Sequence, residues 1–175
     1  TAYVGEELSF SGRLTGDGSP LAGREVRVML DHSTVATVTT DAGGLYAGTF
    51  EMPYRYRPVA SVQAFYFPGG DDILKYLGSF SNVVEINVLY YEASLSLKQE
   101  GAAYPGRTAV LAGKFDYGSA PVCPGRTIEV YVDDTPAGEF DVGGEFSLNL
   151  PVPDNTVVGK HTVTVIAPGE GRYAP

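Results

Sequence analysis

Residues 18–50 read GSPLAGREVRVMLDHSTVATVTTDAGGLYAGTF, and this stretch decides the fold class. Val26, Val28 and Leu30 occupy every second position, a period of two that places them on one face of a β-strand. Two further alternating runs follow, and each is bounded by turn-forming Gly, Asp or Pro residues. The stretch therefore predicts three short strands joined by tight turns, with Val26, Val28 and Leu30 facing a core.

A second copy of this pattern lies in residues 118–150, GSAPVCPGRTIEVYVDDTPAGEFDVGGEFSLNL. Its Ile128, Val130 and Val132 take the positions of the three core residues of the first copy. The turn residues also match, whereas the outward positions differ. This distribution is typical of a shared core rather than of a shared active site.

Glycines recur at matched positions of the two copies. Gly43-Gly44 in the first copy and Gly143-Gly144 in the second precede the third strand. Because glycine tolerates positive φ, each pair predicts a β-hairpin. Gly12 and Gly113 lie inside matched strands, residues 8–14 and 109–115, which predicts a bulge or a close approach of another part of the chain.

The repeat predicts two domains, residues 1–90 and residues 91–175, each large enough for a modest core. Residues 93–99 have no counterpart before Tyr3, and residues 80–89 have none after the second copy. The first domain is therefore expected to lack its opening strand and the second its closing strand, as in a piece of a longer array. No long stretch has a helical period, so the chain is predicted to be all-β.

The last strands of the two copies can be aligned in two ways. Alternation matches Ala64 with Val165, whereas matching Pro68 with Pro168 shifts the alignment by one residue. We prefer the alternation, because a slip of one residue would turn the apolar face to solvent.

The composition excludes several classes of partner. The chain has 12 Lys and Arg against 21 Asp and Glu, a formal net charge of −9. Nucleic acids and anionic membranes are therefore not expected as partners, since phosphate binding needs clustered basic residues. No run is apolar and long enough to cross a membrane, so direct membrane insertion is not expected. The one cysteine, Cys123, allows no internal disulfide, and its loop position predicts a small buried side chain.

Few residues could carry catalysis or bind a metal. His32 and His161 occupy unrelated places in the repeat and no Cys/His cluster occurs, so we expect no catalytic residue, metal site or cofactor. Asp31, Asp133 and Asp134 stand in predicted turns, where aspartate commonly accepts backbone hydrogen bonds.

Asp71 and Asp72 follow Gly69-Gly70 in a predicted loop. Their carboxylates could bind Ca²⁺, but the loop lacks the alternating oxygen ligands of an EF-hand. The preferred interpretation is a solvated loop, and Ca²⁺ binding stays an open alternative.

Tyr54, Arg55, Tyr56 and Arg57 form the least generic segment and the candidate binding site. Tyrosine offers rigid contact area, and arginine offers a planar set of donors. In the alternative interpretation, the tyrosines cover the edge of the core and the arginines neutralise an acidic surface.

The turns and strands of the chain resemble the Ig-like repeats of bacterial and archaeal surface proteins. The segments that carry the resemblance are FSGRLTGDGSPLAGREVRV (residues 10–28), TTDAGGLY (residues 39–46) and APGEGRYAP (residues 167–175). Carboxypeptidase regulatory-like, transthyretin-type domains share the first two segments. The resemblance implies two tandem Ig-like β-sandwich domains and no particular ligand.

The same resemblance implies a non-catalytic module of a cell-surface or secreted prokaryotic protein, with further domains in a longer chain. Such a module acts as a spacer, a display element or an interaction scaffold. Two alternatives stay open: an adhesin-type module that binds protein or glycan, and an accessory domain of a larger surface enzyme whose catalytic part lies outside this chain. The chain has no Trp, so a glycan site would have to use tyrosine.

Overall fold

The protein is described from a computed structural model that covers residues 1–175. The chain divides into two compact units, Thr1–Tyr90 and Tyr91–Pro175. Both are built from strands, and the one helical element is a 3₁₀ turn, η1 (Gly70–Asp72). No helix has the length and hydropathy needed to cross a bilayer. The protein is thus all-β, and each unit is described by itself.

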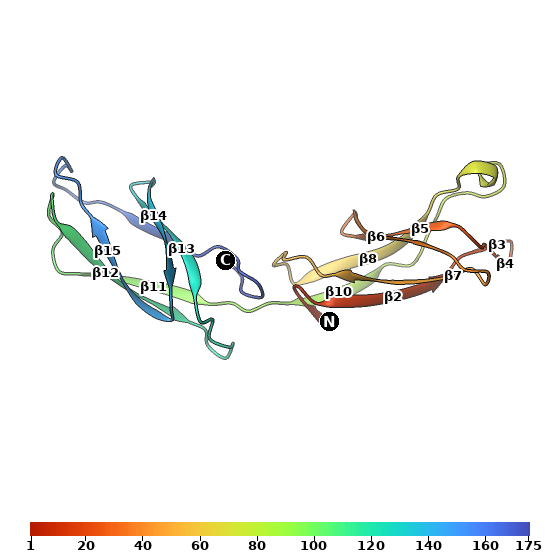
Figure 1. Cartoon of the computed structure of the whole chain (residues 1–175), viewed down its shortest axis with the longest axis horizontal. Coiled ribbons are helices and arrows are strands. Elements are labelled where there is room, and N and C mark those ends of the chain that lie inside the picture. The colour runs from red at the N-terminus through yellow and green to blue at the C-terminus, as the bar shows by residue number, and fades with distance from the viewer. The chain divides into compact units, whose positions relative to one another are not determined.

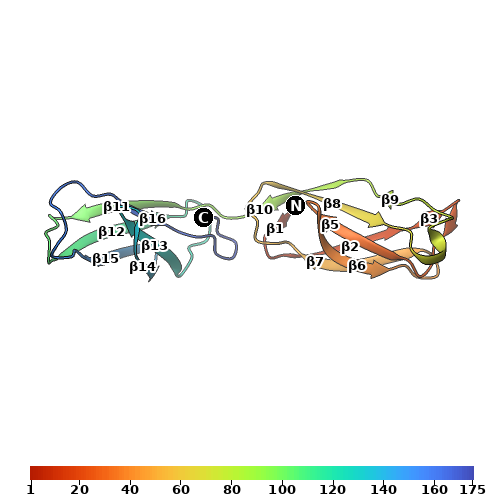
Figure 2. The ribbon, with the colours of Figure 1, turned by 90° about the horizontal axis from the view of Figure 1, so that it is seen from above.

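The first unit is a sandwich of two sheets. Its strands are β1 (Ala2–Tyr3), β2 (Glu7–Arg13), β3 (Thr15–Gly16), β4 (Ser19–Pro20), β5 (Glu25–Leu30), β6 (Ser33–Thr39), β7 (Leu45–Glu51), β8 (Val59–Tyr66), β9 (Ser79–Phe80) and β10 (Val84–Leu89). One sheet has the order β1-β10-β8-β5-β6, with β9 beside β8, and the other pairs β2 with β7. The two sheets lie face to face (Figures 1 and 2) and enclose the core.

The second unit repeats this Ig-like arrangement. Its strands are β11 (Ser94–Glu100), β12 (Thr108–Asp116), β13 (Arg126–Val132), β14 (Thr135–Val142), β15 (Glu145–Pro151) and β16 (Val163–Ile166). One sheet has the order β11-β12-β15 and the other the order β14-β13-β16. Both sheets contribute side chains to a single buried cluster.

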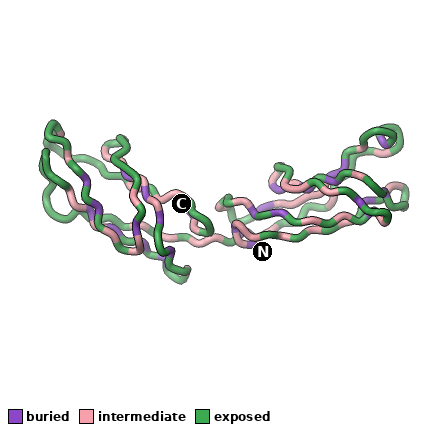
Figure 3. Tube along the Cα trace, in the orientation of Figure 1, coloured by how far each residue is buried: buried purple, intermediate pink, exposed green.

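The predicted core positions lie inside both units. Val26, Val28 and Leu30 of β5 are at most 2% exposed, and Ile128 and Val130 of β13 are equally buried. Buried residues alternate with less buried ones along both strands. Figure 3 shows that buried positions are interspersed with exposed and intermediate ones along both units. The period of two therefore placed the interior faces correctly.

The Gly-Gly turns do not form hairpins between paired strands. β6 pairs with β5, whereas β7 pairs with β2, so the turn at Gly43-Gly44 carries the chain from one sheet to the other. The turn at Gly143-Gly144 does the same between β14 and β15. The hairpin prediction was wrong because glycine permits a tight turn but does not determine which sheet the next strand joins.

The strand register decides the alignment of the last strands. Val28 pairs with Ala64, and its counterpart Val130 pairs with Val165. Ala64 and Val165 are therefore equivalent, as the alternation predicted, and the proline-based alignment is wrong by one residue.

Each internal glycine lies beneath an aromatic ring of the neighbouring strand. Gly12 pairs with Tyr46, and Gly113 pairs with Phe146. A Cβ atom added to either glycine would overlap the ring of its partner. The predicted close approach is confirmed, and its cause is an aromatic side chain.

The two units differ in which strand edges are covered. β12 lies between β11 and β15, whereas its counterpart β2 pairs only with β7. Conversely, β8 is bordered on its outer side by β10 and β9, whereas the counterpart β16 has no outer neighbour. Each unit therefore presents one open sheet edge that is covered in the other.

Candidate functional site

The predicted binding residues Tyr54, Arg55, Tyr56 and Arg57 lie between β7 and β8. They form tight turns rather than a strand: the Arg55 amide donates to the carbonyl of Pro53 (2.7 Å), and the Arg57 amide donates to the carbonyl of Arg55 (2.9 Å). Both arginines are exposed. The segment is therefore not an extended strand.

The two tyrosines of this segment have different surroundings. Tyr54 is exposed, and its ring lies against Gly5. Tyr56 is half-buried against the core of the first unit, where its ring meets the ring of Tyr90 edge-on at 5.8 Å. This packing accounts for Tyr56, and a binding role for the segment stays a prediction.

Two of the turn aspartates, Asp31 and Asp133, accept backbone hydrogen bonds, as predicted. The Ser61 amide donates to Asp31 Oδ1 (2.9 Å), and the Thr162 amide donates to Asp133 Oδ1 (2.9 Å). Asp31, Asp133 and Asp134 all adopt positive φ. Asp31 and Asp133 thus fasten the turn after one strand to the beginning of another, and this structural role recurs in both units.

The two histidines have unrelated settings. His161 Nδ1 lies 2.5 Å from Asp133 Oδ2, and its Nε2 lies 2.7 Å from the carbonyl oxygen of Val157. The bond to Asp133 raises the pKa of His161, and the same bond lowers the pKa of Asp133. His32 is exposed in the turn after β5. No group of three or more His, Cys, Asp or Glu side chains could hold a metal ion.

Cys123 is buried, as predicted. Its Sγ lies 3.0 Å from the carbonyl oxygen of Gly125, so the thiol donates a hydrogen bond inside its own loop. The residue packs in the core of the second unit beside Tyr117 and Ile128. Its role there is packing.

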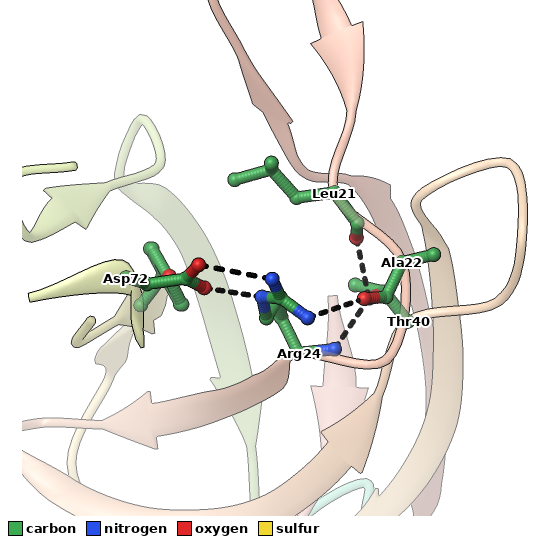
Figure 4. Close-up of polar contacts among 6 residues, drawn as sticks. Leu21, Ala22, Arg24, Thr40 and Asp72 are labelled. Atoms are coloured by element: carbon green, nitrogen blue, oxygen red, sulfur yellow. Dashed lines mark hydrogen bonds and ion pairs between the residues drawn. The ribbon is translucent and has the colours of Figure 1, made fainter. Parts of the chain in front are cut away.

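The most developed polar cluster joins Arg24 to Asp72 (Figure 4). Arg24 Nε and Nη2 donate to the two carboxylate oxygens of Asp72, and the Nη2–Oδ1 distance is 2.9 Å. Tyr66 Oη donates to Asp72 Oδ2 (2.8 Å). Asp72 is 3% exposed, so the prediction of a solvated loop was wrong for this residue. A two-pronged arginine pair of this kind fixes orientation as well as charge.

The electrostatics of the cluster follow from these bonds. The hydrogen bonds from Arg24 lower the pKa of Asp72, against the opposing effect of burial. Burial raises the pKa of Tyr66, and the bond to Asp72 raises it further. Asp72 is therefore ionised and Tyr66 protonated at neutral pH. All three side chains are engaged with one another, which makes the cluster an anchor.

The cluster is fixed on the side of Arg24 as well. Arg24 Nη1 donates to the carbonyl of Ala22 (2.9 Å), and the Arg24 amide donates to Thr40 Oγ1 (2.9 Å). Thr40 Oγ1 in turn donates to the carbonyl of Leu21 (2.6 Å), as Figure 4 shows. The guanidinium thus belongs to a rigid part of the sandwich.

The anchored segment is residues 67–80, which we call the apolar loop. It contains η1 and projects from the end of the first unit opposite the N-terminus (Figure 1). Leu74 and Leu77 are 97% and 90% exposed, and Phe67, Ile73 and Phe80 are each more than half exposed. Large apolar side chains concentrated in this way on a monomer indicate an interaction surface.

The base of the apolar loop is aromatic. The rings of Phe67 and Phe80 lie 3.8 Å and 4.4 Å from the ring of Phe65, centroid to centroid, and they cover it. A hollow of about 560 Å³ adjoins them and is lined by Phe67 together with the charged Arg27 and Asp71. The loop therefore combines an apolar tip with a mixed polar and aromatic base.

The second unit has an arginine at the position matched to Arg24, and it contacts different groups. Arg126 is buried, and its Nη2 donates to the carbonyls of Pro168 (2.8 Å) and Ala174 (3.0 Å). Its guanidinium lies over the rings of Phe115 (5.2 Å) and Tyr173 (5.9 Å). Among residues 167–175, which correspond to residues 66–74 of the first unit, no large apolar side chain is exposed.

Sequence reasoning missed the anchor because its partners are 48 residues apart. The signal that could have found it is the Gly-Arg dipeptide at Gly23-Arg24 and Gly125-Arg126, matched between the copies. An arginine retained at a matched position indicates a structural partner in both units, although it does not identify that partner.

Comparison with known proteins adds little. No protein-family model matches the chain, and no curated protein matches it. Among solved structures, a similar chain is the "Central Fibronectin-III array of RIM-binding protein", with 12% sequence identity and a TM-score of 0.32. The match covers 93% of this chain and 58% of that chain. At this similarity it carries no functional argument, and the Ig-like β-sandwich assignment rests on the sheets described above.

Proposed function

We propose that this chain is a non-catalytic tandem Ig-like module of a bacterial or archaeal cell-surface or secreted protein. It acts as a spacer and interaction scaffold, and it contacts a protein partner through the apolar loop of its first unit. Two self-filled sandwiches and a formal charge of −9 support a display role, because charge of one sign favours solubility of the folded modules.

One observation carries the interaction role. The apolar loop exposes five large apolar side chains on a segment that the ion pair between Arg24 and Asp72 fastens to the sandwich. A buried apolar contact of this size releases ordered water and favours association by roughly 25 cal/mol per Å². Rigid anchoring adds to this, because little loop entropy is lost on binding.

The experiment compares two double variants in a binding screen. Leu74→Ser with Leu77→Ser removes the apolar tip, and Val157→Ser with Val158→Ser removes equally exposed apolar residues from the second unit as the matched control. The wild-type chain and both variants are tested against arrays of extracellular proteins and glycans. We expect a protein partner whose affinity falls about tenfold or more with the loop variant and is unchanged with the control.

Two results would count against the proposal. A partner that binds the loop variant as tightly as the wild type places the contact elsewhere. Equal loss with both variants indicates non-specific apolar adhesion. Circular dichroism of each variant checks that neither change unfolds the protein.

Glycan binding at residues 54–57 is the second candidate. It is favoured by the exposed ring of Tyr54 next to the exposed Arg55. Because Tyr56 packs on the core, Tyr54→Ala is the informative variant: loss of a glycan signal with unchanged melting temperature would support this role. The accessory-domain role needs a catalytic domain outside this chain.

A further inference from the structure

The turn after β13 is fastened to the beginning of β16 in the same way as the matched segments of the first unit. The Thr162 amide donates to Asp133 Oδ1 (2.9 Å), and the Asp133 amide donates to the carbonyl of Thr162 (2.9 Å). Ser61 and Asp31 form the same two bonds in the first unit (2.9 Å and 3.0 Å). The residue before Thr162 can therefore be compared directly with the residue before Ser61.

That residue is His161 in the second unit and the buried Ala60 in the first. His161 Nδ1 lies 2.5 Å from Asp133 Oδ2, and its Nε2 lies 2.7 Å from the carbonyl oxygen of Val157. A carboxylate and a carbonyl oxygen can only accept, so both ring nitrogens must carry a proton for both bonds to exist. The arrangement thus requires the imidazolium form of His161. We call these two bonds the His161 bridge.

The bridge fixes a part of the chain that has few other contacts. Residues 152–162 connect β15 to β16, and the backbone of Val152 bonds to the segment before β12. Among residues 157–160, the carbonyl of Val157 is the one backbone group with a hydrogen bond inside the protein. Val157 and Val158 are both exposed, so apolar packing does little to hold them. The position of this stretch therefore depends on the protonation of one histidine.

Loss of one proton breaks the bond to Val157 rather than the bond to Asp133. A hydrogen bond to a charged acceptor is stronger than a bond to a neutral one, so the remaining proton stays on Nδ1, next to the carboxylate. The bare Nε2 then faces the carbonyl oxygen of Val157, and the two lone pairs repel each other. The bonds between Thr162 and Asp133 do not involve the ring, so they remain.

We propose that His161 is a pH-sensitive switch for the loop of the second unit. As the imidazolium it joins Asp133 to Val157 and holds residues 157–160 in place. As the neutral ring it releases them, while the turn after β13 stays fastened to β16. The surface that Val157 and Val158 present is thus rigid when the bridge is formed and mobile when it is broken.

The charge that acts on the ring comes from Asp133, in the turn after β13. No hydrogen bond or ion pair joins the ring to Asp134 or Lys160, the exposed charged neighbours in the sequence. The bond to Asp133, and after it the bond to Val157, raises the pKa of His161, and the bond to His161 lowers the pKa of Asp133. The bridge is therefore fully formed between the ordinary values of aspartate, about 3.9, and histidine, about 6.5. It is lost as the pH rises through the raised pKa of His161.

The test is a pH titration of the intact 175-residue protein by NMR. Ring nitrogen shifts of His161 report its protonation, and methyl relaxation of Val157 and Val158 reports the mobility of the loop. We expect His161 to titrate at a higher pH than the histidine of an unstructured peptide. The two valines should become more mobile over that same pH range. Val83, an exposed valine of the first unit, is the internal reference and should not change.

Two variants separate the bridge from a general effect of pH. His161→Gln removes the titrating group, so Val157 and Val158 should have the same mobility at every pH. Asp133→Asn removes the charge but keeps an oxygen that can accept from Thr162, and asparagine tolerates the positive φ of this position. The titration of His161 should then move down toward that of the peptide. Circular dichroism checks that each variant is folded, and if Asp133→Asn unfolds the second unit, His161→Gln decides.

Two results would overturn the proposal. One is equal mobility of Val157 and Val158 on both sides of the His161 titration, which would mean that the ring does not hold the loop. The other is a His161 titration that Asp133→Asn leaves in place, which would mean that the carboxylate does not hold the ring.

Discussion

Arg24 and Arg126 occupy the same position in the two units and use their charge in different ways. Arg24 meets the buried carboxylate of Asp72. Arg126 donates hydrogen bonds to two carbonyls, and its guanidinium lies over two aromatic rings. Its Nε has no hydrogen-bond acceptor. Both arrangements hold the segment that follows the matched strand. Asp72 depends on this partner, because its buried carboxylate without the arginine would be an uncompensated buried charge, whereas Arg24 is partly exposed.

This dependence gives a pH-linked prediction for Asp72. We expect Asp72→Asn to lower the melting temperature of the first unit at neutral pH, because Arg24 loses its charged partner. The pKa of Asp72 lies below its ordinary value of about 3.9. The ion pair therefore stabilises the folded unit above that ordinary value, and its contribution is lost as the pH falls through the lowered pKa.

The measurement is a series of thermal melts of wild type and variant between neutral pH and strong acid. The difference in melting temperature should be constant near neutrality and should shrink in acid. Asp71→Asn is the control. Asp71 is an exposed neighbour of Asp72, and its substitution changes the net charge by the same amount. A difference that persists undiminished in acid would mean that the charge of Asp72 is not what stabilises the loop.

At the scale of elements, the matched strands β2 and β12 have one feature in common. A glycine in the strand leaves room for the aromatic ring of its cross-strand neighbour: Tyr46 lies over Gly12, and Phe146 lies over Gly113. The ring lies over the glycine backbone, in the place that a side chain at that position would occupy, and this contact buries part of the ring. The sequence shows the glycines at matched positions, and the strand register shows why they are needed.

We expect Gly113→Ala to destabilise the second unit by about 1–3 kcal/mol, because the added methyl group collides with the Phe146 ring and forces the strands apart. Gly143→Ala is the matched control. Gly143 has open space around its Cβ position and no positive φ, so its substitution should stay within about 0.5 kcal/mol. Urea denaturation of both variants measures the difference. Equal effects would show that ring and glycine do not pack as described.

At the scale of the whole molecule, the protein contains two units with separate interiors. Val28 belongs to the interior of the first unit and Val130 to that of the second, and each is 1% exposed. Burying an unpaired carboxylate costs about 4 kcal/mol or more, a large share of the 5–15 kcal/mol that typically stabilises a domain.

We therefore expect Val130→Asp to unfold the second unit and Val28→Asp to unfold the first, each without unfolding the other. Heteronuclear NMR spectra report this directly, as loss of dispersed signals from one unit only. Arg27→Asn changes an exposed residue beside Val28 and should leave the spectrum intact. Loss of both sets of signals from one substitution would show that the units fold as one body.

The sequence by itself determined the all-β class, the repeat, the interior faces of β5 and β13 and the turn role of Asp31 and Asp133. These features are local: alternation, turn chemistry and hydrogen bonds to nearby backbone depend on residues close together in the chain. The sequence also showed Gly12 and Gly113 inside predicted strands. Glycine is uncommon there, so these positions indicated a close approach before the structure was known.

Only the tertiary structure decided which sheet each strand joins and where Asp72 finds its partner. Each of these depends on groups that are far apart in the chain and meet only when the sheets close. The exposed tip at Leu74 and Leu77 belongs to the same category, since an apolar residue in a loop is shown to face solvent only when everything around it has been placed. Local patterns thus determined how the strands form, and long-range packing determined what their loops and edges present.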